Sequence, residues 1–209
     1  LKPIPILEDG TKVIYVIQRD GSKLEEEIKL AVHDIPAMLS KIRTIAKYVR
    51  TDYLRDVIYG TKNDKKKIRL RIQDNFEFRL VDATYKYRIA VEEGIKKEVE
   101  ETLYKGNSCE DALKIILSQG EFVEENSYEK TRIIFSGPHD TEITLDIYPY
   151  GAWIEIEGES SKIHDVAKRL GFAQKEYIDT GADDLYLAWI KKHNLPEMWD
   201  VRFGLSGNK

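Results

Sequence analysis

Charged residues recur in pairs two positions apart, and this pattern limits the folds open to the chain. Glu25, Glu27 and Lys29 alternate with positions that include Ile28 and Leu30. Side chains of a β-strand point alternately to its two faces, so the three charges would share one face. Five further segments repeat the pattern, at Arg69/Arg71, Lys86/Arg88, Glu98/Glu100, Lys130/Arg132 and Glu155/Glu157. One solvated face would explain one or two such segments, whereas six predict a closed or strongly curved sheet whose charged faces look at each other.

The charges of these inward faces have both signs. Burying a charge costs free energy unless it is paired or bound to an ion. Lysine and arginine bind phosphate oxygens through charge-assisted hydrogen bonds. Carboxylates bind hard divalent cations such as Mg²⁺ or Mn²⁺. The lining therefore indicates a ligand that is both polyanionic and metal-bound.

In this ordered pattern the sequence resembles the CYTH or triphosphate tunnel metalloenzyme family, which includes class IV adenylyl cyclases, thiamine triphosphatases and inorganic triphosphatases. The E-x-E-x-K signature of the first tunnel strand matches Glu25, Glu27 and Lys29. The later signatures follow in the family order: R-x-R at Arg69 and Arg71, T-x-K at Thr84 and Lys86, E-x-E at Glu98 and Glu100, K-x-R at Lys130 and Arg132, and an Asp followed by E-x-E at Asp146, Glu155 and Glu157. Each pair alone is a weak signal, but the ordered set is fairly specific.

The resemblance implies an α+β fold, an antiparallel eight-stranded closed β tunnel with a charged interior and helices packed on the outside. We expect one CYTH-like domain over residues 1–209, with the tunnel core at 24–171 and a C-terminal helical tail at 172–209. Residues 1–23 are predicted to form an extra N-terminal hairpin, which departs from the family pattern. The segment from Asp56 to Tyr59 is only a partial match to the D-x-Y-Y motif of the family.

Capping signals place the outer helices. Asp34 before Ile35-Pro36 is typical of a helix start, and Ser108 opens a capping-box pattern. Further helices are expected at 161–170 and 183–192. Strands are expected at 46–59, 68–72, 76–80, 83–90, 96–103 and 122–135, followed by a hairpin from 142 to 157.

The resemblance also implies a role for each charged residue. The expected phosphate-binding set is Lys29, Arg69, Arg71, Lys86, Lys130 and Arg132, with Arg88 as a weaker candidate. The expected ligands of Mg²⁺ or Mn²⁺ are Glu25, Glu27, Asp146, Glu155 and Glu157. Glu98 and Glu100 are expected to hold a second metal or to orient the attacking water, and they join Glu25, Glu27 and Lys29 as the predicted catalytic residues.

Three functions could use this set of phosphate-binding and metal-binding residues, and the sequence does not decide among them. We rank first a metal-dependent hydrolase of inorganic tripolyphosphate or of an organic or nucleoside triphosphate, because hydrolysis needs only the residues that bind the phosphates and the metal. A class IV adenylyl cyclase, which converts ATP to cyclic AMP and pyrophosphate, is the second hypothesis. A non-catalytic module that binds polyphosphate or nucleotides is the third. A barrel for apolar ligands would need an apolar lining, which the charged alternation argues against.

Composition limits the kinds of partner that we expect the protein to bind. The net charge of −4 gives no sign of a general nucleic-acid-binding surface. Cys109 is the single cysteine, so no intrachain disulfide is expected. No apolar run reaches the length of a membrane span, and we expect a cytoplasmic monomer or homodimer that binds a triphosphate-containing small molecule. The three tryptophans, Trp153, Trp189 and Trp199, are expected to serve in packing rather than in stacking on a base.

Overall fold

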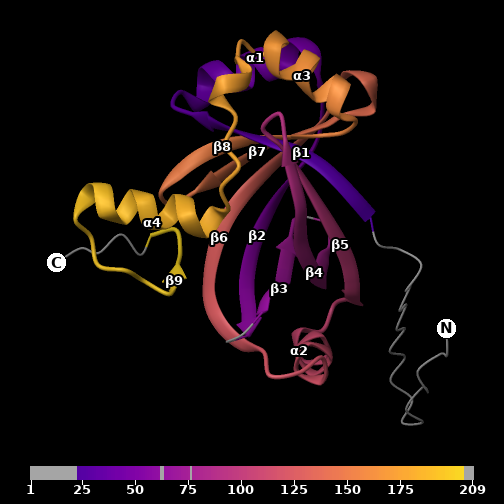
Figure 1. Ribbon diagram of the computed structural model, residues 1–209, viewed down its shortest axis with the longest axis vertical. Coiled ribbons are helices and arrows are strands. Elements are labelled where there is room, and N and C mark those ends of the chain that lie inside the picture. The colour runs from indigo at the N-terminus through magenta and orange to yellow at the C-terminus, as the bar shows by residue number, and fades with distance from the viewer. Residues whose placement is uncertain (1–22, 62–63, 76, 205–209) are drawn as a thin grey trace.

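Eight antiparallel strands close into a barrel in the computed structural model, which describes residues 23–61, 64–75 and 77–204 (Figure 1). The strand order is β2-β3-β4-β5-β1-β8-β7-β6, and pairing of β2 with β6 closes the ring. The strands are β1 (Lys23–Val32), β2 (Lys47–Thr61), β3 (Asp64–Asp74), β4 (Arg79–Glu92), β5 (Ile95–Gly106), β6 (Val123–Ser136), β7 (Glu142–Tyr148) and β8 (Gly151–Glu157). The predicted α+β fold with a closed eight-stranded tunnel is confirmed, whereas the predicted N-terminal hairpin lies almost wholly outside the described residues.

One strand boundary differs from the prediction. Residues 76–80 and 83–90 were expected to form two strands, but β4 is a single strand that begins at Arg79. The side-chain oxygen of Asn75 accepts hydrogen bonds from the backbone N–H groups of Glu77, at 2.8 Å, and Phe78, at 3.0 Å. This Asn-centred turn satisfies the backbone groups that a strand would have used.

The predicted capping residues begin the outer helices. The Asp34 carboxylate accepts from the Ala37 N–H at 2.9 Å at the start of α1 (Ile35–Ile45). The Ser108 hydroxyl accepts from the Asp111 N–H at 3.2 Å at the start of α2 (Cys109–Ser118). Helix α3 (Ser160–Arg169) lies with α1 over one end of the barrel wall, and α2 covers the opposite end (Figure 1).

The apolar faces of the strands point outward, against these helices. Ile28 and Leu30 of β1 are fully buried in a cluster that also contains Ile42 of α1 and Val166 of α3. A second cluster joins apolar residues of β2, β3, β4 and β5 to Ala112 and Ile116 of α2. With the apolar residues taken outward, the alternating charged residues are left on the inside of the barrel.

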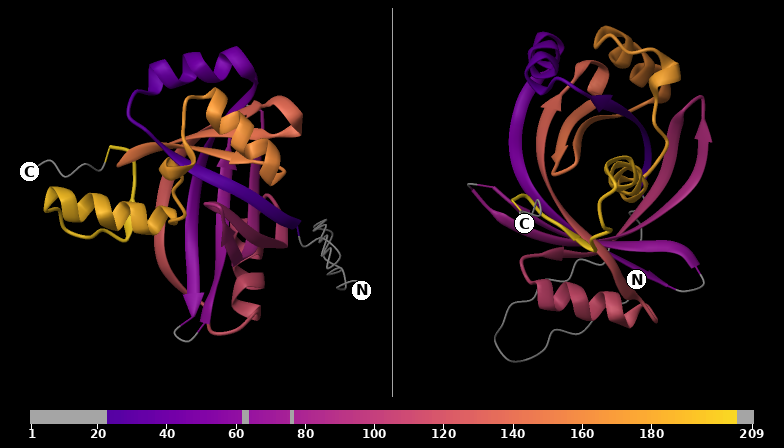
Figure 2. Two further views of the ribbon diagram at one scale, coloured as in Figure 1. Left: turned by 45° about the horizontal axis from the view of Figure 1, so that its top comes forward. Right: turned by 90° about the vertical axis from the view of Figure 1, so that its left-hand side faces the viewer.

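The C-terminal segment takes a different position from the other helices. Helix α4 (Ala182–His193) lies across one mouth of the barrel, where it is seen end-on in the right-hand view of Figure 2. Tyr150 anchors it, because the Tyr150 ring packs 5.3 Å from that of Tyr186 and its hydroxyl donates to the Ala182 carbonyl at 3.2 Å. After α4, β9 (Asp200–Val201) adds a short parallel pairing to β6. None of the helices in the described part of the chain has the length and apolar character that a membrane-spanning helix needs.

Candidate functional site in the charged tunnel

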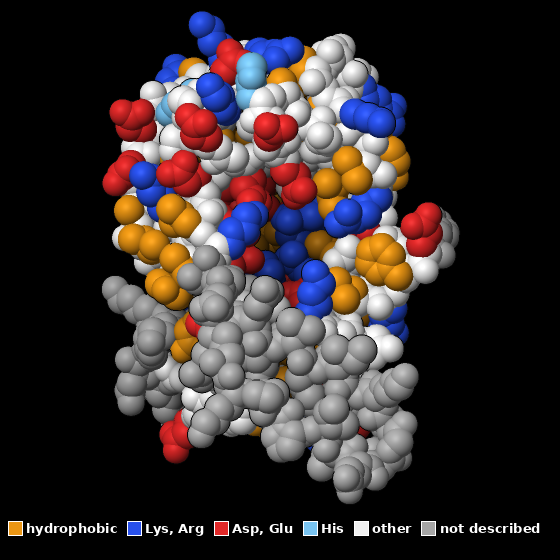
Figure 3. Space-filling model, turned by 90° about the vertical axis from the view of Figure 1, so that its right-hand side faces the viewer, with side chains coloured by type: hydrophobic (Ala, Val, Ile, Leu, Met, Phe, Trp, Pro, Cys, Tyr) orange, Lys and Arg blue, Asp and Glu red, His pale blue; other side chains and the backbone are white. Residues whose placement is uncertain are grey.

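The barrel encloses a cavity of about 1660 Å³ that is lined by charged side chains from all eight strands. Figure 3 looks into the mouth opposite α4, where lysine and arginine side chains gather in the hollow and acidic side chains stand above them. Thirteen of the fourteen predicted site residues line this cavity: Glu25, Glu27, Lys29, Arg69, Arg71, Lys86, Arg88, Glu98, Glu100, Lys130, Arg132, Glu155 and Glu157. The alternation in the sequence thus brings side chains from distant segments into one space.

Asp146 is the predicted site residue that does not line the cavity. Asp146 lies directly across from Arg132 in the strand register and is fully buried, and Arg132 donates to both of its carboxylate oxygens at 2.6 Å while Lys130 donates at 2.6 Å. Burial opposes ionisation, but Arg132 and Lys130 hold the pKa of Asp146 below its usual value. In this arrangement Asp146 orients two cations, and a metal role for it stays a prediction.

A second buried carboxylate supports the basic wall in the same way. Arg71 donates two hydrogen bonds to Asp56, at 2.7 and 2.6 Å, and Asp56 is 1% exposed. Burial would raise the pKa of Asp56, but the Arg71 charge and hydrogen bonds outweigh it and lower the pKa. Asp56 belongs to the partial D-x-Y-Y match, so the sequence contained this signal although no site role was predicted for it.

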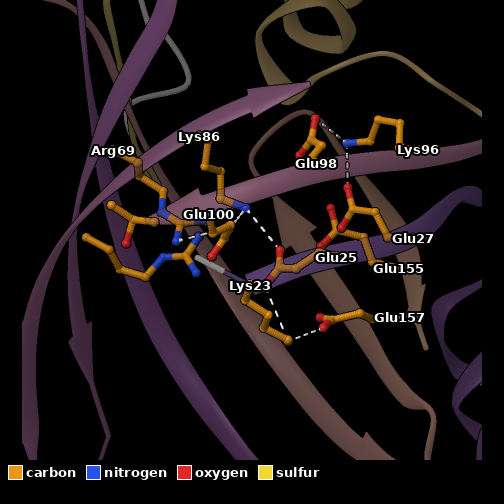
Figure 4. A network of polar contacts seen from close by, with 12 residues as sticks. Lys23, Glu25, Glu27, Arg69, Lys86, Lys96, Glu98, Glu100, Glu155 and Glu157 are labelled. Carbon is orange, nitrogen blue, oxygen red and sulfur yellow. Dashed lines mark hydrogen bonds and ion pairs between the residues drawn. The ribbon is translucent and has the colours of Figure 1, made fainter. Parts of the chain in front are cut away.

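The nearby carboxylates do not fully neutralise two cations of this wall, Arg69 and Lys86. The closest carboxylate oxygens to Arg69, from Asp82 and Glu100, are both 3.9 Å away, and its buried Nε has no hydrogen-bond partner among the described residues. Burial and the neighbouring Arg71 lower the pKa of Arg69. Burial and Arg69 likewise lower the pKa of Lys86 to about 8, although Lys86 pairs with Glu100 (Figure 4). This part of the cavity therefore favours an anion.

Lys130 gives a third sign of excess positive charge. It is 3% exposed, and burial together with the nearby Arg132 lowers its pKa to about 8 in spite of the ion pair with Asp146. Its ammonium also lies 3.3 Å from the Tyr148 hydroxyl. The lowered pKa reflects the cost of burying this ammonium close to other cations.

The opposite side of the cavity is acidic. Strand pairing sets Glu27 directly across from Glu157, Glu157 across from Glu142, and Glu25 across from Glu98. Like charges in opposed positions destabilise an antiparallel pair unless something compensates them. Burial raises the pKa of Glu157, and Glu25 and Glu142 raise it further, although Lys23 acts against this. This region therefore favours a cation.

Lysines occupy this acidic region in the structure. Lys23 contacts Glu157 and lies 3.4 Å from Glu25, while Lys96 contacts Glu27 and lies 3.5 Å from Glu98 (Figure 4). Lys96 is 5% exposed, and sequence reasoning missed it. The signal was present, because Lys96 stands two residues before Glu98 and so shares its face.

Glu155 joins the acidic and basic regions. Lys29 lies 3.1 Å from one of its oxygens, and Arg132 donates to the other at 2.5 Å. Burial opposes ionisation, yet these two cations hold the pKa of Glu155 well below its usual range. The cavity is therefore polarised, with an ionised carboxylate between its two parts.

The donor chemistry of the acidic region fits a hard divalent cation. Glu25, Glu27 and Glu157 offer carboxylate oxygens, which Mg²⁺ and Mn²⁺ prefer, and their opposed charges need compensation. Within residues 23–61, 64–75 and 77–204, however, no three acidic, histidine or cysteine side chains converge closely enough to hold a metal as they stand. A cation would have to draw these carboxylates away from Lys23 and Lys96.

Comparison with known proteins identifies the fold. No family model and no curated protein matches the chain. The PH1819 protein of Pyrococcus horikoshii superposes with a TM-score of 0.64 at 22% identity, over 78% of this chain and 98% of that one. A candidate adenylate cyclase from Vibrio parahaemolyticus gives 0.62 at 17% identity, over 80% and 99%. HpAC1 from Hippeastrum, a candidate adenylyl cyclase described as having a dominant triphosphatase activity, gives 0.53 at 15% identity, over 83% and 97%. The resemblance predicted from the sequence is confirmed at the level of the fold.

Proposed function

We propose that this protein is a divalent-metal-dependent hydrolase of triphosphates and a member of the CYTH or triphosphate tunnel metalloenzyme family. The observation that carries the proposal is the polarity of the cavity, in which one region favours an anion and the adjoining region favours a cation. A metal-bound triphosphate has this distribution of charge. The shared fold with a candidate cyclase and with a protein described as a triphosphatase agrees with the proposal.

The basic wall would bind the phosphate chain. Arg69 has hydrogen-bonding capacity that no described residue uses fully, and it would bind phosphate oxygens directly. Arg71 and Arg132 are each held by two hydrogen bonds to a buried aspartate, so their planes are fixed before the ligand arrives. Such fixed cations stabilise negative charge without having to reorganise during the reaction. Lys29, Lys86, Lys130 and Arg88 complete the proposed set.

The acidic region would hold Mg²⁺ or Mn²⁺ through Glu25, Glu27 and Glu157, with Glu155 beside them. A bound divalent cation would supply charge neutralisation at the phosphate oxygens and help to align the attacking water. Glu98 and Glu100 would orient that water, since both line the cavity, Glu98 opposite Glu25 and Glu100 beside Lys86. Lys23 and Lys96 would give up contacts to the carboxylates when the cation binds.

A substrate panel tests this function. The protein is incubated with tripolyphosphate, ATP or thiamine triphosphate, each with Mg²⁺, with Mn²⁺ or with a chelator, and the products are separated and identified. The proposal expects metal-dependent release of terminal phosphate. Cyclic AMP and pyrophosphate as the main products from ATP would favour the cyclase instead, and tight binding without turnover would favour a non-catalytic module. A Glu27→Ala variant that keeps full turnover would contradict the metal role of Glu27.

A further inference from the structure

A second cavity opens beside the tunnel, between β6, α4 and the loop that leads to β9. Its volume is about 670 Å³. The two cavities adjoin, because Lys67, Tyr128, Asp183 and Asp184 line both. A ligand whose phosphates lie in the tunnel would have its other end near this junction.

The walls of the second cavity are aromatic. Tyr128, Tyr150, Tyr186 and Trp199 all line it. Trp199 is 66% exposed, so it does not pack in the buried core. The backbone holds it in place, because the Trp199 carbonyl accepts from the Ser127 N–H at 2.7 Å and the neighbouring Met198 N–H donates to the Tyr186 hydroxyl at 2.9 Å. An exposed indole on an anchored backbone offers a flat face for stacking.

The polar groups of this cavity are mostly acceptors. Among the described residues that line it, Lys67 is the one cation, and the five carboxylates are Glu124, Glu125, Asp183, Asp184 and Glu197. Lys67 is shared between Glu125 and Asp183, at 3.2 Å from each, so the other three carboxylates have no lysine or arginine partner among the described residues of the cavity wall. The buried side-chain oxygen of Asn126 lacks a hydrogen-bond donor among the described residues. A buried acceptor without a donor is costly, and a ligand N–H group would remove that cost.

We propose that this second cavity binds the organic group of the substrate, and that this group is a planar nitrogen heterocycle with N–H donors and a positive charge. The inference rests on the proposed function of the tunnel, which supplies the site for the phosphate chain. Trp199 would stack on the heterocycle, Asn126 would accept from its amino group, and the unpaired carboxylates would attract its charge. Inorganic tripolyphosphate lacks such a group and would bind in the tunnel alone.

Two variants separate this subsite from the tunnel. Trp199→Ala removes the stacking face, and Leu195→Ala is the matched control, because Leu195 is an exposed apolar residue that follows the same helix and does not line the cavity. Dissociation constants are measured by calorimetry in the presence of a chelator, so that turnover does not interfere. The probes are thiamine triphosphate, whose organic group is cationic, ATP, whose base is neutral, and tripolyphosphate.

We expect Trp199→Ala to weaken thiamine triphosphate by about tenfold, as stacking on an aromatic side chain predicts, and to leave tripolyphosphate within about twofold. ATP should be weakened less, and Leu195→Ala should change none of the three constants. A second variant, Glu124→Gln with Glu197→Gln, should weaken thiamine triphosphate more than ATP. Equal losses for all three probes, or no loss for thiamine triphosphate, would overturn the subsite. Failure of the proposed function would show differently, as absence of turnover with every triphosphate when metal is present.

Discussion

Glu27 of β1 lies directly opposite Glu157 of β8 in the strand register, and a lysine contacts each of them. Two opposed carboxylates on the wall of a cavity are unfavourable unless a cation lies near them. Lys96 and Lys23 supply that cation in the structure. The same carboxylates are the proposed metal ligands, so the two lysines and the metal compete for one set of oxygens.

Lys23→Ala tests this competition. The Lys23 side chain is more than half exposed, so its ion pairs contribute no more than about 1 kcal/mol. Removing it should tighten Mn²⁺ binding by a few-fold, up to about fivefold, because Glu25 and Glu157 would no longer hold an ammonium group. Calorimetric titration with Mn²⁺ measures the effect. Lys97→Ala is the control, since Lys97 pairs with Glu26 and Glu92 instead; weaker Mn²⁺ binding in Lys23→Ala alone would contradict the account.

Variants at Arg71 and at Arg69 should separate an effect on the stability of the fold from an effect on ligand binding. Replacing Arg71 by Ala leaves the buried Asp56 carboxylate without its two hydrogen bonds and should lower the free energy of unfolding by about 3–5 kcal/mol. Arg88→Ala is the control, because Arg88 is partly exposed and its nearest carboxylate oxygen is 3.6 Å away; it should change the free energy of unfolding by no more than about 0.5 kcal/mol. Urea unfolding measures both. Similar losses for the two variants would show that the Asp56 pairing has no special weight.

Arg69→Met should act on the ligand instead. The nearest carboxylate oxygens lie 3.9 Å from Arg69, so little ion pairing is lost in the free protein. Charge-assisted hydrogen bonds to phosphate are worth about 1.5–3 kcal/mol, so tripolyphosphate should bind at least about tenfold more weakly. Calorimetry gives the dissociation constant, and urea unfolding checks that the variant is folded. Unchanged affinity in a stable Arg69→Met protein would remove Arg69 from the phosphate site.

The tunnel lysines predict a dependence on pH. Burial, together with Arg69 or Arg132, lowers the pKa of Lys86 and of Lys130 from 10.5 to about 8. Between pH 8 and 10.5 the folded protein therefore binds fewer protons at these groups than the unfolded chain, and their contribution to the free energy of unfolding rises with pH across this window. A bound polyanion favours the charged lysines, so its affinity should fall as the pH rises above about 8.

Proton uptake is the direct measure of this effect. Tripolyphosphate is titrated at pH 8.5 with a chelator present, in two buffers that differ in ionisation enthalpy, and the difference in heat gives the number of protons bound. The wild-type protein should take up more protons than Lys86→Arg, because arginine stays charged at this pH. Equal uptake by the two proteins would show that Lys86 is already fully charged before the ligand binds.

The strand alternation predicted most of the fold and most of the tunnel. Pairs such as Arg69 and Arg71 point inward because β3 buries Ile68 and Leu70 on its other face. The pattern does not predict how deeply each charged side chain is buried. Asp146 shares the alternation, yet Arg132 and Lys130 bind its carboxylate and it does not line the cavity. That outcome depends on how neighbouring strands stack their long side chains.

The second cavity could not be predicted from the sequence, for a different reason. Trp199 and Asn126 lie far apart in the chain, and no period or motif connects them. They come together because Tyr150 anchors α4 across the mouth of the barrel and the loop after α4 returns to β6. Such a contact between a tail and a barrel follows from tertiary packing, which local patterns do not encode.

The central claim is that one cavity binds a triphosphate and a divalent cation together, and linked binding tests it most directly. The dissociation constant of tripolyphosphate is measured by calorimetry at low temperature, so that hydrolysis is slow during the titration. The measurement is made with and without Mn²⁺, for the wild type and for Glu27→Gln. The account predicts that Mn²⁺ tightens tripolyphosphate binding in the wild type by at least about tenfold and that Glu27→Gln loses most of this gain. Equal affinity with and without Mn²⁺ in the wild type would contradict it.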